Sequence, residues 1–258
     1  MRTLIVIPAR YASTRFPGKP LAMLGGETVV SRVWHRAKEV SGVNDVVVAT
    51  DDERIYNHVV GFGGGEGAAM MTATTHQSGT DRCGEVMRHF EEQHKYYDVV
   101  VNIQGDEPFV EPEQIEPLVK CFEQSDVQIA TLVTRFTSVD EMLSPNNVKV
   151  VCTKAGNAMY FSRQAIPYCR GVEVGEWLDH SVYYKHVGIY AFRSNVLAEL
   201  CRLEQSPLEQ SEKLEQLRWL YNGYAIRVLE TDHSNVGIDT PEDLAEAERK
   251  LKEKNIML

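Results

Sequence analysis

The sequence predicts an α/β fold, with a mixed, mostly parallel sheet and helices on both faces. In the first half of the chain, short β-branched runs alternate with segments of helical periodicity. Runs of this kind, without polar alternation, are typical of parallel strands covered on both faces. After about residue 125 the strand-like runs become more frequent. Because no linker, repeat or low-complexity segment separates the two patterns, we expect one domain over residues 1–258 with excursion strands after about residue 125.

The first half of the chain indicates a βαβαβ unit. We expect strands at residues 3–7, 46–50 and 99–104, and helices at residues 28–40, 53–60 and 79–94. Strands joined in this way by helices form right-handed crossovers, which favours a parallel sheet. The Gly-rich stretch at 63–67 is predicted to be a flexible connection, because no Lys or Ser/Thr pair follows it as in a phosphate-binding loop.

The sequence of the second half predicts strands and helices that follow one another at shorter intervals. We expect strands at residues 127–134, 148–153, 158–161, 184–192 and 226–230, and helices at residues 195–203, 211–221 and 242–254. The last helix has the clearest start, because Thr240 is a favourable cap and Pro241 suits a first turn.

Composition excludes several classes of protein. The chain has 27 basic and 37 acidic residues, a net charge of −10, so it has no general positive field for binding nucleic acid. No apolar run approaches the length of a membrane helix, and Pro8 interrupts the first apolar run too early for a signal peptide. The five cysteines include no CxxC pair. We therefore expect a cytoplasmic protein with reduced cysteines.

The segment after the first predicted strand is a candidate phosphate site. This segment, ARYASTRFPGKP at residues 9–20, is basic and rich in small residues although the chain is acidic. It contains three cations, two hydroxyls and a glycine that allows close approach: Arg10, Arg15, Lys19, Ser13, Thr14 and Gly18. A solvated turn is the alternative interpretation. The position favours a ligand site, since ligands of open α/β sheets bind beyond the carboxyl ends of strands.

Two acidic segments are candidates for metal binding. In NIQGDEP, Asp106 and Glu107 follow a predicted buried strand, and Gly105 eases the turn. In VGIDTPEDL, Asp239 stands just before the predicted last helix. Mg²⁺ usually takes one or two protein carboxylates and shares its remaining positions with phosphate and water. A solvated turn for the first segment and helix capping for Asp239 remain as alternatives.

Three further segments offer polar groups to a ligand. THQSGTDR, at residues 75–82, leads into a helix whose exposed N–H groups could bind a base, a ribose or an anion, with Gln77, Ser78 and Arg82 beside them. YFSRQAIP and YYKHVGIYAF place Arg163, Lys185 and His186 near the ends of later strands. In one cleft these three side chains would suit an anionic small molecule.

Seven motifs in this order resemble the 3-deoxy-manno-octulosonate cytidylyltransferase family, also called CMP-Kdo synthetases. They are ARYASTRFPGKP, HQSGTDR, NIQGDEP, FSRQAIPY, HVGIYAF, SPLEQSEKLEQLR and GIDTPEDL, and they extend from about residue 3 to about residue 250. The resemblance implies a Rossmann-like nucleotidyltransferase fold, a homodimer, and a Mg²⁺-dependent reaction of CTP with Kdo that yields CMP-Kdo and pyrophosphate for lipopolysaccharide assembly.

The resemblance also implies roles for individual residues. Arg10 and Lys19 would contact the triphosphate, and Asp106 and Asp239 would ligate Mg²⁺. The residues expected around the nucleotide are Ala9, Arg10, Ser13, Thr14, Arg15, Lys19, His76, Gln77, Ser78, Gly79 and Arg82. The residues expected to face the sugar acid are Gln104, Arg163, His186, Tyr190 and Glu215. The reaction needs no covalent nucleophile, and we find no Cys/His pair or GxSxG motif that would supply one.

Departures from the family pattern leave alternatives open. The segment at residues 66–75 looks longer than is usual, with Ala73 and Thr75 where Arg and Asp are expected. The choice between Kdo and its 8-amino relative therefore stays open. A CMP-sialic acid synthetase would share the reaction type, but its opening loop would resemble ARGGSKG. A non-catalytic nucleotide-binding domain is the third alternative, and the presence of Arg10, Lys19, Asp106 and Asp239 argues against it.

Overall fold

The computed structural model describes residues 1–13, 15–63, 65–233 and 237–256, and the chain divides into two compact units. The first unit comprises Met1–Glu116 together with Asn235–Leu258, and the second comprises Pro117–Ser234. The expectation of a single domain over residues 1–258 stays a prediction.

The first unit contains the elements predicted as a βαβαβ beginning, with some additions. Its strands are β1 (Thr3–Ala9), β2 (Met23–Leu24), β3 (Glu27–Thr28), β4 (Asp45–Thr50), β5 (Ala69–Met71) and β6 (Val99–Asn102). Its helices are α1 (Val29–Lys38), α2 (Glu53–Phe62), α3 (Gly79–Glu92) and α10 (Pro241–Ile256), with α4 (Pro112–Lys120) leading into the second unit and 3-10 turns at Lys19–Leu21 and Glu66–Ala68. The sequence analysis missed β5, the β2–β3 pair and α4.

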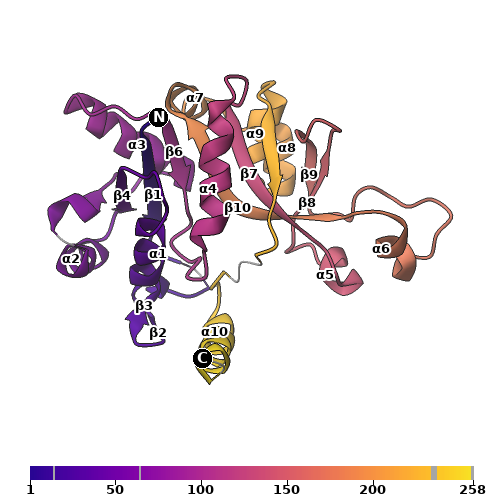
Figure 1. Ribbon diagram of the computed structural model, residues 1–258, viewed down its shortest axis with the longest axis horizontal. Helices are drawn as coiled ribbons and strands as arrows, with labels where there is room; N and C mark the ends of the chain where they lie inside the picture. The colour runs from indigo at the N-terminus through magenta and orange to yellow at the C-terminus, as the bar shows by residue number, and fades with distance from the viewer. Residues whose placement is uncertain (14, 64, 234–236, 257–258) are drawn as a thin grey trace. The chain divides into compact units, whose positions relative to one another are not determined.

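The first unit is built around a parallel sheet in the order β6-β1-β4-β5. Figure 1 shows β6, β1 and β4 of this sheet. Ile5 in β1 pairs with Val46 of β4 and with Val101 of β6. The residues Leu4 to Ile7 are fully buried, as a strand covered on both faces requires. α1 and α2 pack on β4 and on each other, and α3 packs on β1 and β6. The expected parallel arrangement is confirmed.

The strand order reverses at β1, and this reversal determines where a ligand can enter. β4 and β5 extend the sheet on one side of β1, while β6 pairs on its other side. Ligands of doubly wound sheets bind at such a reversal, outside the carboxyl ends of the strands. A Cβ on Gly105, just after β6, would lie 2.7 Å from the carbonyl oxygen of Pro8. Glycine therefore allows the segment after β6 to pass against the end of β1.

The C-terminal segment of the first unit is attached to the same edge. The backbone N–H of Ile238 donates to the carbonyl oxygen of Asp106 at 2.9 Å, and the Ile238 side chain is buried with Leu24 and Ala247. The Thr240 hydroxyl accepts from the N–H of Asp243, whose carboxylate accepts from the N–H of Thr240. This reciprocal cap confirms the predicted helix start and places Asp239 outside the helix.

The second unit contains more strands and mixed pairing. Its strands are β7 (Ile129–Arg135), β8 (Lys149–Cys152), β9 (Ala158–Ser162), β10 (Tyr184–Arg193) and β11 (Ile226–Glu230). Its helices are α5 (Val139–Leu143), α6 (Trp177–His180), α7 (Ser194–Leu200), α8 (Pro207–Glu212) and α9 (Gln216–Tyr221), with 3-10 turns at Cys121–Glu123 and Val174–Glu176. β11 runs parallel to β7, whereas β10 runs antiparallel to both β7 and β8. The α/β fold with a mixed, mostly parallel sheet is thus confirmed.

One predicted helix of the second unit is two helices. The segment predicted as a helix at 211–221 contains the end of α8 and all of α9, which are separated at Lys213. Lys213 has a φ of +54°, a left-handed conformation that ends a helix. α8 begins earlier, with a capping box between Ser206 and Glu209 and Pro207 in its first turn. The short helices α5 and α6 were not predicted.

Candidate functional site

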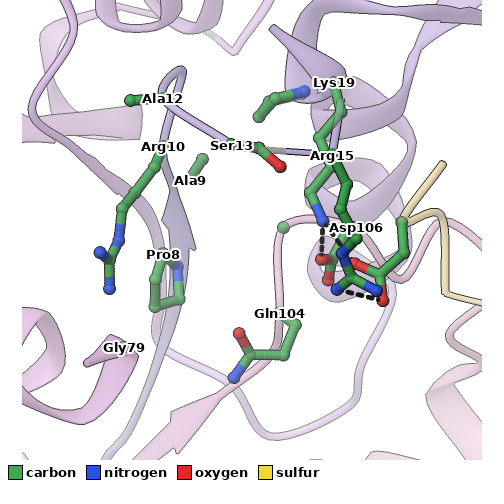
Figure 2. Close-up of a pocket in the computed structure, with 13 residues that line it drawn as sticks. Pro8, Ala9, Arg10, Ala12, Ser13, Arg15, Lys19, Gly79, Gln104 and Asp106 are labelled. Atoms are coloured by element: carbon green, nitrogen blue, oxygen red, sulfur yellow. Dashed lines mark hydrogen bonds and ion pairs between the residues drawn. The ribbon is translucent and has the colours of Figure 1, made fainter. Parts of the chain in front are cut away.

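A cavity of about 320 Å³ opens beyond the carboxyl ends of β1 and β6, within the first unit (Figure 2). Segments from four parts of the chain meet there: the end of β1 with the loop after it, the start of α3, the turn after β6, and the residue before the cap of α10. The residues lining it are Pro8, Ala9, Arg10, Ala12, Ser13, Arg15, Lys19, Pro20, Gly79, Gln104, Gly105, Asp106 and Asp239. This is the position that the strand reversal predicts for a ligand.

Four charged side chains form an ion-pair cluster on one side of the cavity. The Lys19 ammonium donates to the carboxylate of Asp106 and, at 3.1 Å, to Oδ1 of Asp239. Nη2 of Arg15 lies 2.9 Å from the other oxygen of Asp239. Figure 2 shows Lys19 and Arg15 directed toward the carboxylates. The cluster joins the opening loop to both predicted metal ligands.

Charge rather than burial determines the ionisation of Lys19. The side chain is only 13% exposed, and this burial by itself would lower its pKa. The carboxylates of Asp106 and Asp239 outweigh burial and raise the pKa of Lys19 above its ordinary value. Lys19 is therefore a cation at neutral pH, held between two carboxylates that were predicted to share a metal ion.

The other side of the cavity is formed by Arg10 and the start of α3. Nη2 of Arg10 donates to the carbonyl oxygen of Gln77 at 3.0 Å, and the side chain is otherwise exposed. Figure 2 shows Arg10 on the far side of the opening from Asp106. Gly79 begins α3 and lines the cavity, so the N-terminal turn of a 14-residue helix lies beside it. The arrangement leaves the Arg10 guanidinium and this helix end available to an anion.

Ser78 and His76 have structural partners in the same segment. The Ser78 hydroxyl accepts from the N–H of Asp81 at 3.1 Å, and the Asp81 carboxylate bonds back to Ser78, which completes a capping box. Nε2 of His76 contacts the carboxylate of Glu85. These bonds orient the segment that the family resemblance places around the nucleotide. Direct contact of Ser78 and His76 with a nucleotide stays a prediction.

Arg82 has a different environment from the one expected of a nucleotide ligand. Its side chain is 0% exposed, and its guanidinium donates to the Thr72 hydroxyl at 2.6 Å and to the carboxylate of Asp51. Asp51 follows β4 and Thr72 follows β5, so Arg82 links the ends of two strands to α3. It is absent from the described residues that line the cavity. Its observed role is structural, and nucleotide contact stays a prediction.

The residues predicted to face the sugar acid are divided between the two units. Gln104 lines the cavity of the first unit, and its amide lies 3.4 Å from Oδ1 of Asn102. The other four lie in the second unit and are Arg163, His186, Tyr190 and Glu215. Thr14 lies outside the described residues.

His186 and Tyr190 belong to an aromatic cluster in the second unit. The His186 ring centroid lies 5.1 Å from that of Phe161 and 5.2 Å from that of Tyr190, which packs edge-on against Trp219. Nε2 of His186 lies 3.0 Å from the Thr131 hydroxyl. Burial lowers the pKa of His186 to about 3, so its ring is neutral at pH 7. The sequence predicts His186 as a candidate cation for the sugar carboxylate; in the structure its neutral ring offers a hydrogen bond rather than a positive charge.

Tyr190 presents a buried polar group whose neighbour is Thr131. Its hydroxyl is inaccessible to solvent and makes no hydrogen bond of normal geometry among the described residues. Burial, with the charge of Glu215 nearby, raises the pKa of Tyr190, so the group stays protonated. Buried hydroxyls are rarely left unsatisfied. A substrate hydroxyl or a water molecule would supply the missing bond.

Arg163 is oriented by neutral acceptors. Its Nε donates to the carbonyl oxygen of Glu212 at 2.7 Å, and its Nη1 donates to that of Pro145 at 2.9 Å. Two bonds to carbonyl oxygens fix the direction of the guanidinium without neutralising its charge. The side chain can therefore still attract an anion, as the sequence analysis expected.

The sequence analysis missed two features of this site. It treated Asp106, Asp239 and Lys19 as separate ligands of metal and phosphate, whereas they form one ion-paired cluster with Arg15. It also gave no role to Tyr11, in the middle of the opening loop, which accepts hydrogen bonds from the N–H groups of Ser13 and Gly18. The one sequence signal for this role is the position of Tyr11 in a loop that has to turn back toward the sheet.

Comparison with known proteins identifies the family. A family model described as cytidylyltransferase matches residues 4–231. A protein of Parabacteroides distasonis named 3-deoxy-manno-octulosonate cytidylyltransferase is 52% identical over 251 residues, covering 96% of this chain and 97% of that protein. The chain belongs to the 3-deoxy-manno-octulosonate cytidylyltransferase family. A member from Fusobacterium nucleatum is 46% identical and is covered completely, as is this chain.

Solved structures agree with this family and with the fold. A structure described as CMP:2-keto-3-deoxy-manno-octonic acid synthetase complexed with CTP matches with a TM-score of 0.89 and 41% identity, covering 98% of this chain and 100% of that chain. A 4-diphosphocytidyl-2C-methyl-D-erythritol synthase from Anaerococcus prevotii matches with a TM-score of 0.62 at 14% identity, and shares the fold alone. The resemblance and the nucleotidyltransferase fold expected from the seven motifs are confirmed. As a member of this family, the chain is an enzyme of the nucleotidyltransferase class.

Proposed function

We propose that this chain transfers CMP from CTP to 3-deoxy-manno-octulosonate (Kdo), releasing pyrophosphate. The observation that best supports this function is the cavity at the end of β1, where cations of the opening loop lie beside two carboxylates from distant parts of the chain. In the reaction, the anomeric hydroxyl of Kdo loses its proton and attacks the α-phosphorus of CTP. The bond from that phosphorus to the β-phosphate oxygen breaks, so negative charge develops on the leaving pyrophosphate.

The first unit would bind the nucleotide and balance that charge. Arg10 has an exposed guanidinium, and Lys19 remains cationic in the cavity. Both can donate charge-assisted hydrogen bonds to phosphate oxygens. Further donors to the nucleotide would come from the opening loop and the α3 segment, at Ala9, Ser13, Thr14, Arg15, His76, Gln77, Ser78 and Gly79. These groups bind and orient CTP and need no covalent nucleophile.

The residues of the cavity fit a Mg²⁺ ion. Asp106 and Asp239 already share one positive charge, the Lys19 ammonium, so their oxygens face a common cation position. No group of three or more His, Cys, Asp or Glu side chains within the described residues could hold a metal alone. Mg²⁺ suits this limited donor set, because it commonly completes its shell with substrate phosphates and water. When bound, Mg²⁺ would supply positive charge to the phosphate oxygens.

The second unit would recognise the sugar acid. Arg163 offers a retained positive charge to the Kdo carboxylate, while His186 and Tyr190 offer neutral hydrogen bonds to its hydroxyls. Glu215 and, from the first unit, Gln104 would accept or donate further hydrogen bonds. Because the segment at 66–75 departs from the family pattern, 8-amino-Kdo is the alternative sugar to compare with Kdo.

A cytoplasmic homodimer that provides CMP-Kdo for lipopolysaccharide assembly completes this proposal. The described part of the chain contains no helix long and apolar enough to span a membrane. Light scattering of the purified protein would test the dimer, and a monomeric mass at micromolar concentration would contradict it.

The decisive experiment is pyrophosphate release with CTP and Mg²⁺ against Kdo, 8-amino-Kdo and sialic acid, each with and without EDTA. We expect release with Kdo that EDTA abolishes. Preference for 8-amino-Kdo or sialic acid would replace the sugar in the proposal. CTP binding without release on any of the three sugars would favour a non-catalytic nucleotide-binding protein.

A further inference from the structure

Tyr11 lies in the opening loop between the two cations Arg10 and Lys19, but it is not among the described residues that line the cavity. The guanidinium carbon of Arg54 lies 3.3 Å from the centroid of the Tyr11 ring. This distance is that of a close stack, in which a planar cation lies over an aromatic face. Arg54 belongs to α2, an element with no other assigned part in the reaction.

Arg54 is itself held in place by the end of β4. Its Nε and Nη2 donate to the two carboxylate oxygens of Asp52, at 2.9 and 2.6 Å. Asp52 caps α2, and its backbone N–H donates to the hydroxyl of Thr50, the fully buried last residue of β4. A connected set of contacts therefore leads from the rigid sheet through Asp52 and Arg54 to the Tyr11 ring.

Tyr11 in turn sets the path of the loop. Its carbonyl oxygen accepts hydrogen bonds from the N–H groups of Ser13, at 3.0 Å, and Gly18, at 2.9 Å. Gly18 has a φ of +74°, and a Cβ there would lie 3.0 Å from the Tyr11 ring. The ring thus packs against the residue directly before Lys19. A displaced Tyr11 would release both ends of the loop that presents Arg10 and Lys19.

We propose that Arg54 and Tyr11 are positioning residues, whose stack holds Arg10 and the segment at 15–19 in the conformation that binds the CTP triphosphate. The inference rests on the proposed function of that loop. A loop ordered before binding loses less conformational freedom when the ligand arrives, so the stack strengthens CTP binding without touching CTP. The stack orders the loop before CTP arrives, and the same ordered loop is needed in the ground state and in the transition state. Loss of the stack therefore raises KM for CTP and leaves kcat nearly unchanged.

The test is a double-mutant cycle with Arg54→Met, Tyr11→Leu and the double variant, followed by calorimetric titration of CTP and by kinetics. We expect each single variant to weaken CTP binding roughly 2- to 10-fold, with Kdo KM and kcat near wild type. The double variant should be no weaker than the worse single variant, because both remove the same contact. Tyr11→Phe keeps the ring face and should bind CTP like the wild type.

Two further measurements separate positioning from general effects. Lys250→Met removes one exposed cation and one ion pair from α10 of the same unit, and should leave CTP affinity unchanged. Hydrogen exchange of the Ser13 and Gly18 amides, measured without substrate, should be faster in Arg54→Met than in the wild type and in Lys250→Met. Melting temperatures should be similar in all three.

The inference is overturned by unchanged CTP affinity in Arg54→Met, by additive effects in the double variant, or by equal losses in Lys250→Met. Because the exchange measurement needs no catalysis, it also distinguishes the two proposals. A wild type without transferase activity would contradict the proposed function, whereas an active wild type with an unaltered loop in Arg54→Met would contradict only the role of the stack.

Discussion

The two regions assigned to substrates treat charge in opposite ways. In the first unit, Lys19 forms ion pairs with Asp106 and Asp239 beside an open cavity. In the second unit, burial keeps His186 and Tyr190 neutral. The difference indicates a division of tasks, because phosphates need opposite charges, whereas sugar hydroxyls can be bound by neutral hydrogen-bonding groups. Arg163 is an exception to the neutral side chains of the second unit, because it is a cation whose side chain donates to backbone carbonyl oxygens.

The largest effect is expected from the two carboxylates. Asp106→Asn and Asp239→Asn each remove a charged metal ligand, and turnover should fall by roughly 10²-fold or more, as for other groups that stabilise transition-state charge. Steady-state pyrophosphate release measures this loss. Tyr190→Phe offers a contrast, since it should alter sugar use rather than the metal requirement. Wild-type turnover in Asp239→Asn would remove Asp239 from the metal site.

Lys19→Met should have effects of opposite sign on two ligands. Loss of the ammonium removes a charged hydrogen bond to phosphate, so CTP affinity should fall by about 10- to 150-fold. The same change leaves Asp106 and Asp239 without their shared cation, so Mn²⁺ should bind more tightly in the absence of nucleotide. Calorimetry of each ligand separately tests both signs. Weaker binding of both ligands would show that Lys19 organises the carboxylates rather than competing with metal.

Arg163→Ala should affect the sugar alone. Removing the guanidinium costs a charged hydrogen bond, so KM for Kdo should rise by about 10- to 150-fold while CTP affinity stays close to wild type. Arg163→Lys keeps the charge but loses the planar geometry, and should recover only part of the loss. A defect confined to CTP would place Arg163 on the other substrate.

The smallest expected effect is a pH dependence of stability from His186. Its folded pKa of about 3 lies below the ordinary unfolded value of 6.5, so the unfolded chain binds an additional proton between these two pH values. This one group therefore reduces the free energy of unfolding as pH falls from 6.5 toward 3, by at most about 1.4 kcal/mol per pH unit. Denaturant unfolding at pH 7 and pH 5 should show a smaller difference for His186→Gln than for the wild type. An equal difference would contradict the neutral state of the His186 ring.

The sequence predicted the first unit well because its signals are local. β1 and β4 are continuous β-branched runs, and the loop after β1 shows its cations within ten residues of sequence. The ion-paired cluster could not be predicted in this way. Lys19 is separated from Asp106 by 87 positions and from Asp239 by 220, and only the folded sheet edge brings them together.

Burial explains most of the remaining differences. Arg82 looks in sequence like an anion ligand, but α3 turns it inward to Asp51 and Thr72. His186 looks like a cation, but its aromatic neighbours make the neutral ring more stable. Neither environment could be predicted, because residue type indicates what a side chain can do in water, whereas its solvent exposure depends on packing by distant segments.

The central claim, that Asp106, Asp239 and Lys19 form the metal-dependent nucleotide site, is tested most directly by titrating Mn²⁺ with electron paramagnetic resonance detection, with and without CTP. We predict weak Mn²⁺ binding to the wild type alone, because Lys19 occupies the shared position, and much tighter binding when CTP is present. In the double variant Asp106→Asn/Asp239→Asn, CTP should no longer tighten Mn²⁺ binding to the protein. Any Mn²⁺ bound should then match what CTP binds by itself in solution. Undiminished CTP-dependent Mn²⁺ binding in that double variant would contradict the claim.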